Sequence, residues 1–195
     1  KTICLRGHAD IPHRSFDENM IVEKKDGTLW MLTRTFDGIG ESFSNDGGYT
    51  WTPGRKSHID GPCSRFHIRR LKSGRLLMIN HYQFDQRIDL DDIMRQGNVK
   101  SWKGRSHLTA LLSEDDGKTW PYTLLLDERN EVSYPDAKEA ADGYIYVTYD
   151  WERVTQREIL MARFTEEDIL KGQLSSPNGK LRILVNKATG QPDIH

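Results

Sequence analysis

The 195-residue sequence has little net charge, few cysteines and no long apolar run. A net charge of −1 gives the chain no overall attraction for nucleic acid or for an anionic membrane surface. No apolar run approaches the length of a membrane-spanning helix, and the opening KTICLRGHAD lacks the apolar segment of a signal peptide. We therefore expect no nucleic-acid partner and no membrane span, and these features leave the compartment open.

Cysteine and metal-ligand patterns are equally sparse. Cys4 and Cys63 are too few for a disulfide framework, and two buried thiols are favoured over a single bridge because free cysteine is commonly buried. The seven histidines are scattered and form no cysteine–histidine cluster with zinc spacing. No glycine-rich phosphate loop occurs. We expect neither a metal nor a cofactor.

The sequence does contain regular pairs of β-rich runs around tight turns. Hydrophobic residues make up 36% and charged residues 29%, which is typical of one soluble globular domain. The pairs are MIVEKKDGTLWMLTRT around Asp26-Gly27, FHIRRLKSGRLLMINHY around Ser73-Gly74, and DAKEAADGYIYVTYDW around Asp142-Gly143. Each pair predicts a β-hairpin.

An eight-residue pattern, S-x-D-x-G-x-T-W, occurs twice, as SNDGGYTW over 44–51 and SEDDGKTW over 113–120. Each copy follows a predicted third strand and precedes a fourth. Glycine can adopt the positive φ that a tight turn needs, and the aspartate carboxylate can accept hydrogen bonds from nearby backbone N–H groups. The pattern therefore predicts a rigid surface turn without a catalytic role. In the last unit EILMARF and LRILVN are the third and fourth strands, and TEEDILKG between them predicts a short helix capped by Thr165.

Four-stranded units repeated in this way predict the blades of a β-propeller. The fold class is all-β, with a single partial propeller domain over 1–195 and blades over about 14–56, 62–130 and 131–187. A polar stretch around residues 84–103 is interpreted as an insertion between a second and a third strand. A β-sandwich of unrelated hairpins is the alternative, which the doubled pattern disfavours.

The doubled pattern resembles the Asp box of the sialidase superfamily, whose six-bladed propellers carry it between third and fourth strands. DENMIVEKKDGTLWMLTR is similar to the family segment that holds the catalytic glutamate and one arginine of the carboxylate-binding triad. The resemblance places these roles at Glu18 and Arg34, with Asp17 where asparagine is usual. GRSHLTALLSEDDG places another triad arginine at Arg105.

The same resemblance assigns the remaining candidates. EVSYPDAKEAADG places the nucleophilic tyrosine at Tyr134, and YVTYDWER places an arginine-bracing acid at Asp150 or Glu152. SRFHIRR adds Arg65 as a further substrate-binding candidate. Glu18, Arg65 and Tyr134 are each expected just before the first strand of a blade, where they would converge on the propeller axis.

These residue types suit an exo-acting, retaining hydrolase that releases a terminal acidic sugar. Arginine forks bind a carboxylate, and a neutral tyrosine nucleophile avoids the repulsion that a carboxylate nucleophile would meet. Glu18 would take the proton from Tyr134. Each residue also has a structural interpretation: a half-buried strand tyrosine, a solvated acid, or a surface or ion-paired arginine.

Several interpretations stay open beside this one. The family's first triad arginine and general-acid aspartate belong to N-terminal blades, so the chain resembles a C-terminal half. Because an open half-propeller exposes strand edges, we expect the remaining blades from an N-terminal part or from another chain. The alternatives are a carbohydrate-binding propeller without activity, an interaction propeller, and a glycosidase for another sugar, since SYPDA departs from the family's YSDL. The expected partner is a sialoside or related glycan, and the resemblance favours a secreted or periplasmic location.

Overall fold

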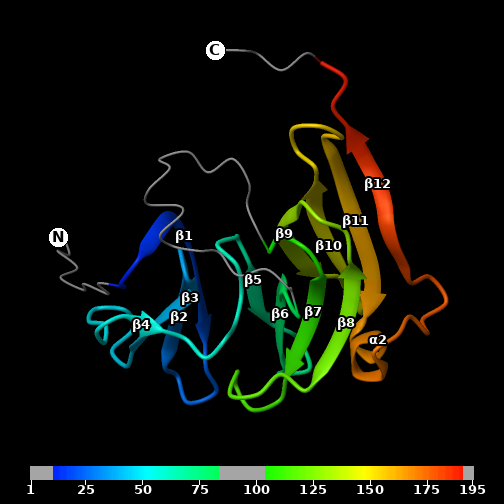
Figure 1. Cartoon of the computed structure of the whole chain (residues 1–195). Coiled ribbons are helices and arrows are strands. Elements are labelled where there is room, and N and C mark those ends of the chain that lie inside the picture. Colours follow the sequence, from blue (N-terminus) through cyan, green and yellow to red (C-terminus); the bar gives the residue numbers. More distant parts are fainter. Residues whose placement is uncertain (1–10, 84–103, 191–195) are drawn as a thin grey trace, which may run out of the picture.

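The structure, a computed structural model, describes residues 11–83 and 104–190. Cys4, the side chain of Asp17 and the insertion around residues 84–103 lie outside the described part. The described chain forms three four-stranded antiparallel sheets and one short helix (Figure 1). The predicted all-β class with three four-stranded blades is therefore confirmed.

Within each sheet the strands follow one another in chain order, so each sheet is a meander. Blade 1 contains β1 (Arg14–Glu23), β2 (Leu29–Thr35), β3 (Gly38–Ser44) and β4 (Arg55–Lys56). Blade 2 contains β5 (His67–Arg70), β6 (Leu76–His81), β7 (Leu108–Ser113) and β8 (Tyr122–Asp127). Blade 3 contains β9 (Val132–Glu139), β10 (Tyr144–Trp151), β11 (Glu158–Thr165) and β12 (Lys180–Lys187).

The predicted hairpin turns join the first two strands of every blade. Their glycines Gly27, Gly74 and Gly143 have φ values of 84°, 87° and 83°, in the left-handed region that glycine enters at least cost. Asp26 Oδ1 accepts a hydrogen bond of 2.9 Å from the backbone N–H of Thr28, which rigidifies the first turn. The three turns therefore give the blades a common starting geometry.

The two S-x-D-x-G-x-T-W segments form the same hydrogen-bonded turn between third and fourth strands. Asp46 Oδ1 accepts from the backbone N–H of Thr50 at 2.9 Å, and Asp115 Oδ1 accepts from that of Thr119 at 2.9 Å. The hydroxyl of each threonine also donates to the other carboxylate oxygen. These donors lower the pKa of Asp46 to about 2, so its carboxylate is ionised at neutral pH.

Two hydrophobic clusters hold the blades side by side. The cluster between blades 1 and 2 includes Trp30, Leu32, Phe66 and Met78, all buried. The cluster between blades 2 and 3 is larger and includes Leu108, which is 0% exposed. β5 contacts both β1 and β9, so the first strands of the three blades form the inner edges of neighbouring sheets.

Helix α2 (Glu166–Lys171) follows β11 as predicted. Thr165 caps it through its hydroxyl, and Asp168 Oδ2 accepts a hydrogen bond from the backbone N–H of Thr165 at 2.8 Å. Gly172 ends the helix in the left-handed conformation, with a φ of 68°. Across the described residues, no helix has the length and apolar character that a membrane span requires. The same residues contain no cluster of histidine, cysteine and acidic side chains suited to a metal ion.

Candidate active site

The first strands of the three blades bring three site candidates to equivalent positions. Glu18, Arg65 and Tyr134 each lie nine residues before the glycine of their own hairpin turn. Arg65 precedes β5, as expected, whereas Glu18 lies inside β1 and Tyr134 inside β9. The expectation that all three precede their strands is therefore wrong for two of them, because β1 and β9 continue beyond a break in their pairing.

That break in pairing coincides with the site on both strands. Between β1 and β2 the register shifts between Arg14 and Asn19, and Glu18 falls in the unpaired stretch. Between β9 and β10 the register also shifts, so that Tyr134 and Pro135 of β9 lie opposite a single residue of β10. Such bulges re-aim side chains and are over-represented next to active sites.

Tyr134 itself adopts a strained backbone conformation. Its φ is 56°, which a non-glycine residue adopts at a cost of about 1–3 kcal/mol. The following Pro135 has no N–H to pair, which is tolerated because β9 lies at the edge of its sheet and Pro135 lies in the bulge. The local sequence therefore holds the tyrosine out of the regular ladder.

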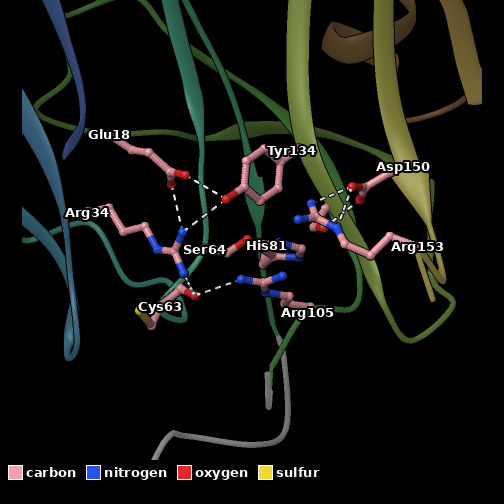
Figure 2. Close-up of polar contacts among 10 residues, drawn as sticks. Glu18, Arg34, Cys63, Ser64, His81, Arg105, Tyr134, Asp150 and Arg153 are labelled. Atoms are coloured by element: carbon pink, nitrogen blue, oxygen red, sulfur yellow. Dashed lines mark hydrogen bonds and ion pairs between the residues drawn. The ribbon is translucent and has the colours of Figure 1, made fainter. Parts of the chain in front are cut away.

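Tyr134, Glu18 and Arg34 meet in one hydrogen-bonded group (Figure 2). The phenol Oη of Tyr134 donates to Glu18 Oε1 at 2.6 Å. Arg34 Nη1 donates to Glu18 Oε2 at 2.7 Å and lies 3.4 Å from Tyr134 Oη. Residues contributed by blade 1 and blade 3, more than a hundred positions apart, are thus joined through one carboxylate.

Opposing effects act on the carboxyl group of Glu18. Burial raises its pKa, while the hydrogen bonds from Tyr134 and Arg34 and the charge of Arg34 lower it. The lowering effects win, so the pKa of Glu18 lies below its ordinary value of 4.5. Glu18 is therefore ionised at neutral pH and able to accept a proton.

Arg34 and Arg105 form a buried layer beneath Glu18 and Tyr134 (Figure 2). Arg34 is 1% exposed and Arg105 is 5% exposed. Arg34 Nη2 donates to the backbone carbonyl of Cys63 at 3.0 Å, and Arg105 Nη2 donates to the same carbonyl at 3.4 Å. Burial and the neighbouring positive charges of Arg34 and Arg153 lower the pKa of Arg105 to about 10. The layer therefore concentrates positive charge below the tyrosine.

A buried histidine fixes the segment that supplies the shared carbonyl. His81 Nδ1 lies 2.9 Å from the carbonyl of Ser106, which can only accept, so Nδ1 carries the hydrogen. Nε2 then accepts from the hydroxyl of Ser64 at 3.2 Å, next to Cys63. Burial lowers the pKa of His81 to about 4, so its ring is neutral at neutral pH. Cys63 itself is buried.

The two acids expected to brace an arginine behave differently. Asp150 Oδ2 accepts from Arg153 Nε at 3.0 Å, and Asp150 Oδ1 accepts from the hydroxyl of Ser133. Glu152 instead accepts a hydrogen bond from the hydroxyl of Thr155. Figure 2 shows the Asp150–Arg153 pair beside the ring of Tyr134.

A pocket opens beside Glu18. It encloses about 190 Å³ and is lined by Glu18, Asn19, Met20, Arg65 and Phe66. Arg65 is half-buried, and residues 11–83 and 104–190 offer its guanidinium no hydrogen-bonding or ion-pairing partner. Arg65 therefore keeps its donors available at the pocket, unlike Arg34 and Arg105.

The repeated four-stranded blades with their matching turns have a counterpart among known families. Residues 13–147 match the family of BNR repeat-like domains. The chain belongs to this family. The predicted membership of the BNR-repeat proteins is thereby confirmed. A search of curated proteins gave no match.

Solved structures show which fold this BNR repeat-like domain shares. The leech intramolecular trans-sialidase has a TM-score of 0.57 at 17% identity, over 78% of this chain and 24% of the leech protein. The Ruminococcus gnavus intramolecular trans-sialidase has 0.54 at 20% identity, over 82% and 34%. The Hadza microbial sialidase has 0.50 at 22% identity, over 68% and 24%. The aligned part amounts to about a third or less of these proteins' length, and the likeness establishes the fold.

Sequence reasoning named every member of the central group of this BNR repeat-like domain but missed Arg153. The guanidinium Cζ of Arg153 lies 4.1 Å from the centroid of the Tyr134 ring. The available signal was its position three residues after Asp150, the spacing of an acid and an arginine that can pair across a tight turn. That signal gives no indication of the ring contact, which depends on the fold.

Proposed function

We propose that this BNR repeat-like domain carries the nucleophile and base of a retaining, exo-acting glycosidase of the sialidase type. The observation that supports the proposal is the 2.6 Å hydrogen bond from Tyr134 Oη to the ionised Glu18, with arginines around it. A tyrosine paired with a base is the nucleophile of sialidases, an exception among glycosidases. The proposed substrate is a glycan with a terminal acidic sugar.

The proposed first step forms a glycosyl–tyrosine bond. Glu18 accepts the phenolic proton of Tyr134 while Oη attacks the anomeric carbon, and the bond to the leaving oxygen breaks with its electron pair. An aryl leaving group departs as a phenolate and needs no proton. A sugar leaving group needs an acid, which the family resemblance places in blades outside this chain. Water then attacks the anomeric carbon and loses a proton to solvent, while the bond to Tyr134 Oη breaks and Glu18 returns its proton to this oxygen. The two inversions give net retention.

The positive charge is proposed to act in two layers. Arg65, with its donors available in the pocket, would bind the substrate carboxylate directly. Arg34 and Arg105 are buried beneath and would add to the positive potential, while Arg34 also orients Glu18. The volume of about 190 Å³ lies below the roughly 300–1,000 Å³ of common ligand pockets, which suits one end of a single sugar.

The test compares wild type with Tyr134→Phe on an aryl sialoside. The variant keeps the ring but loses the nucleophilic oxygen, so turnover should fall by roughly three orders of magnitude or more while the unfolding midpoint stays close to wild type. Tyr146→Phe, in the neighbouring strand β10, is the matched control and should keep full turnover. Near-wild-type turnover in Tyr134→Phe would remove the nucleophile assignment.

A second candidate is a glycosidase for a sugar without a carboxylate. The burial of Arg34, at 1% exposed and held by Glu18, favours it, because this arginine is not presented to a ligand. Aryl glycosides of neutral sugars distinguish the two candidates. Turnover of the sialoside alone supports the first, and turnover of a neutral glycoside alone supports the second.

A further inference from the structure

Arg153 has no part in the function proposed above, yet it lies directly against the proposed nucleophile. Its guanidinium Cζ lies 4.1 Å from the centroid of the Tyr134 ring, within the range of a cation–π contact. Its charge also reaches the buried layer, since it is one of the charges that lower the pKa of Arg105. Arg153 therefore contacts the Tyr134 ring and also contributes positive charge near Arg105.

A small side-chain network holds this guanidinium in place. Arg153 Nε and Nη2 both donate to Asp150 Oδ2, at 3.0 and 2.5 Å. Ser133, next to Tyr134, donates to Asp150 Oδ1, and its Oγ lies 3.4 Å from Arg153 Nη2. One carboxylate thus ties the turn after β10 to the residue that precedes Tyr134 in β9. The backbone adds a bond of 3.0 Å from Glu152 N–H to the carbonyl of Glu131.

We propose that Arg153 is a positioning residue that holds the ring of Tyr134 so that Oη faces Glu18. The catalytic meaning of the assignment rests on the proposed function. Tyr134 needs such support because its backbone lies at a φ of 56° in a bulge, where the β-ladder does not fix it. A cation over the face of the ring attracts the ring and so restrains its orientation.

The pair does not act mainly through overall stability. Arg153 is 47% exposed and Asp150 20% exposed in their side chains, and ion pairs at the surface contribute little to folding. Substitution of Arg153 should therefore leave the fold intact while altering the ring of Tyr134. This separates a positioning role from a structural one.

The experiment places fluorotyrosine at position 134 and records its fluorine NMR signal in the full chain. In Arg153→Gln the signal should shift and broaden, because the ring loses its cation and its fixed orientation. In Arg153→Lys the signal should stay closer to wild type, since a cation is retained. On an aryl sialoside, Arg153→Gln should lower kcat by about 10- to 100-fold with KM nearly unchanged, and Arg153→Lys should recover part of the loss.

Arg129, in the segment between β8 and β9, provides a matched control. Its guanidinium lies 3.8 Å from the centroid of the Trp151 ring and pairs with Asp127, so Arg129→Gln removes the same type of contact from a different ring. It should leave the Tyr134 signal unchanged. If the fluorine signal at position 134 is the same in Arg153→Gln as in wild type, the proposal is wrong. It is also wrong if Arg129→Gln changes this signal as much as Arg153→Gln does. If Tyr134→Phe stays active, the proposed function fails, and the NMR arm still decides whether Arg153 orients the ring.

Discussion

At the scale of single residues, Glu18 is the group on which the proposed chemistry depends. It accepts hydrogen bonds from a phenol and a guanidinium at once, at 2.6 and 2.7 Å. These donors stabilise the carboxylate more than burial destabilises it, so the pKa lies below 4.5. A low pKa makes Glu18 a weak base in the resting state, and the pairing with Tyr134 compensates by holding the proton donor in contact.

This balance predicts the acid limb of the pH profile. The value of kcat/KM for an aryl sialoside should stay level from neutral pH down to about 4.5 and fall only below it, as Glu18 becomes protonated. The stability that ionised Glu18 contributes should likewise be present above pH 4.5 and be lost as pH falls through the lower folded pKa. Steady-state kinetics and chemical denaturation across pH measure the two effects.

Glu18→Gln is the control for this pH dependence. The amide cannot take the proton from Tyr134, so activity should be low at every pH and the acid limb should disappear. An acid limb that persists unchanged in Glu18→Gln would assign that titration to another group.

At the scale of elements, the two S-x-D-x-G-x-T-W turns offer a matched pair of substitutions. Gly48 and Gly117 occupy the same position, with φ values of 93° and 83°, so alanine strains both backbones similarly. A Cβ at Gly117 would lie 2.3 Å from the Trp30 ring, whereas at Gly48 the nearest atom lies 3.6 Å away. The second turn is therefore packed against blade 1, and the first is not packed against a ring in this way.

Gly48→Ala should cost about 1 kcal/mol from the left-handed backbone alone. Gly117→Ala should cost about 2–3 kcal/mol, because the clash with Trp30 adds an overpacking penalty to the same backbone strain. Denaturant midpoints of the two variants provide the comparison. Equal losses would show that the ring moves aside without cost and that the turn does not depend on the contact.

The elements also show how far the sequence predicts this site. Alternating runs around Asp-Gly and Ser-Gly turns predict the hairpins because glycine and the preceding polar residue determine local geometry. The resemblance indicated Glu18 and Tyr134, and the fold brings them into contact. The bulges, the positive φ of Tyr134 and the contact with Arg153 depend on register between strands, which local propensity does not determine.

The burial of Arg34 is the feature of the site that the sequence predicts least well. The resemblance assigns Arg34 to carboxylate binding, and its place between Thr33 and Thr35 at a strand end also allows a surface arginine. Both interpretations imply an accessible guanidinium, but Arg34 is 1% exposed. The cause lies in other segments: the carbonyl of Cys63 and the carboxylate of Glu18 both accept its hydrogen bonds. No pattern within β2 encodes those partners.

At the scale of the whole molecule, the blades are joined unequally. The core between blades 2 and 3 is larger than the core between blades 1 and 2. Blade 1 gains additional connections through Asp116 in the second turn. Asp116 accepts from the backbone N–H of Lys25 at 2.7 Å and pairs with Arg70 at 2.8 Å. Arg70 also donates to the carbonyl of Glu23 at 2.6 Å.

The unequal joining predicts that Asp116→Asn loosens blade 1 selectively. Asparagine tolerates the φ of 60° found at this position, so the turn should survive while the charge pair with Arg70 is lost. Amide hydrogen exchange should then accelerate in β1–β3 and stay unchanged in β10 and β11.

Glu166→Gln is the matched control, because it removes an ion pair between Arg75 of blade 2 and α2, where the larger core remains. It should leave exchange in β1–β3 at the wild-type rate. Since Glu18 belongs to blade 1 and Tyr134 to blade 3, the Asp116→Asn protein should also lose turnover at a lower temperature than it loses the fold of blade 3. If Asp116→Asn instead accelerated amide exchange equally in all three sheets, the three blades would open as one cooperative unit. Asp116 would then stabilise that whole unit.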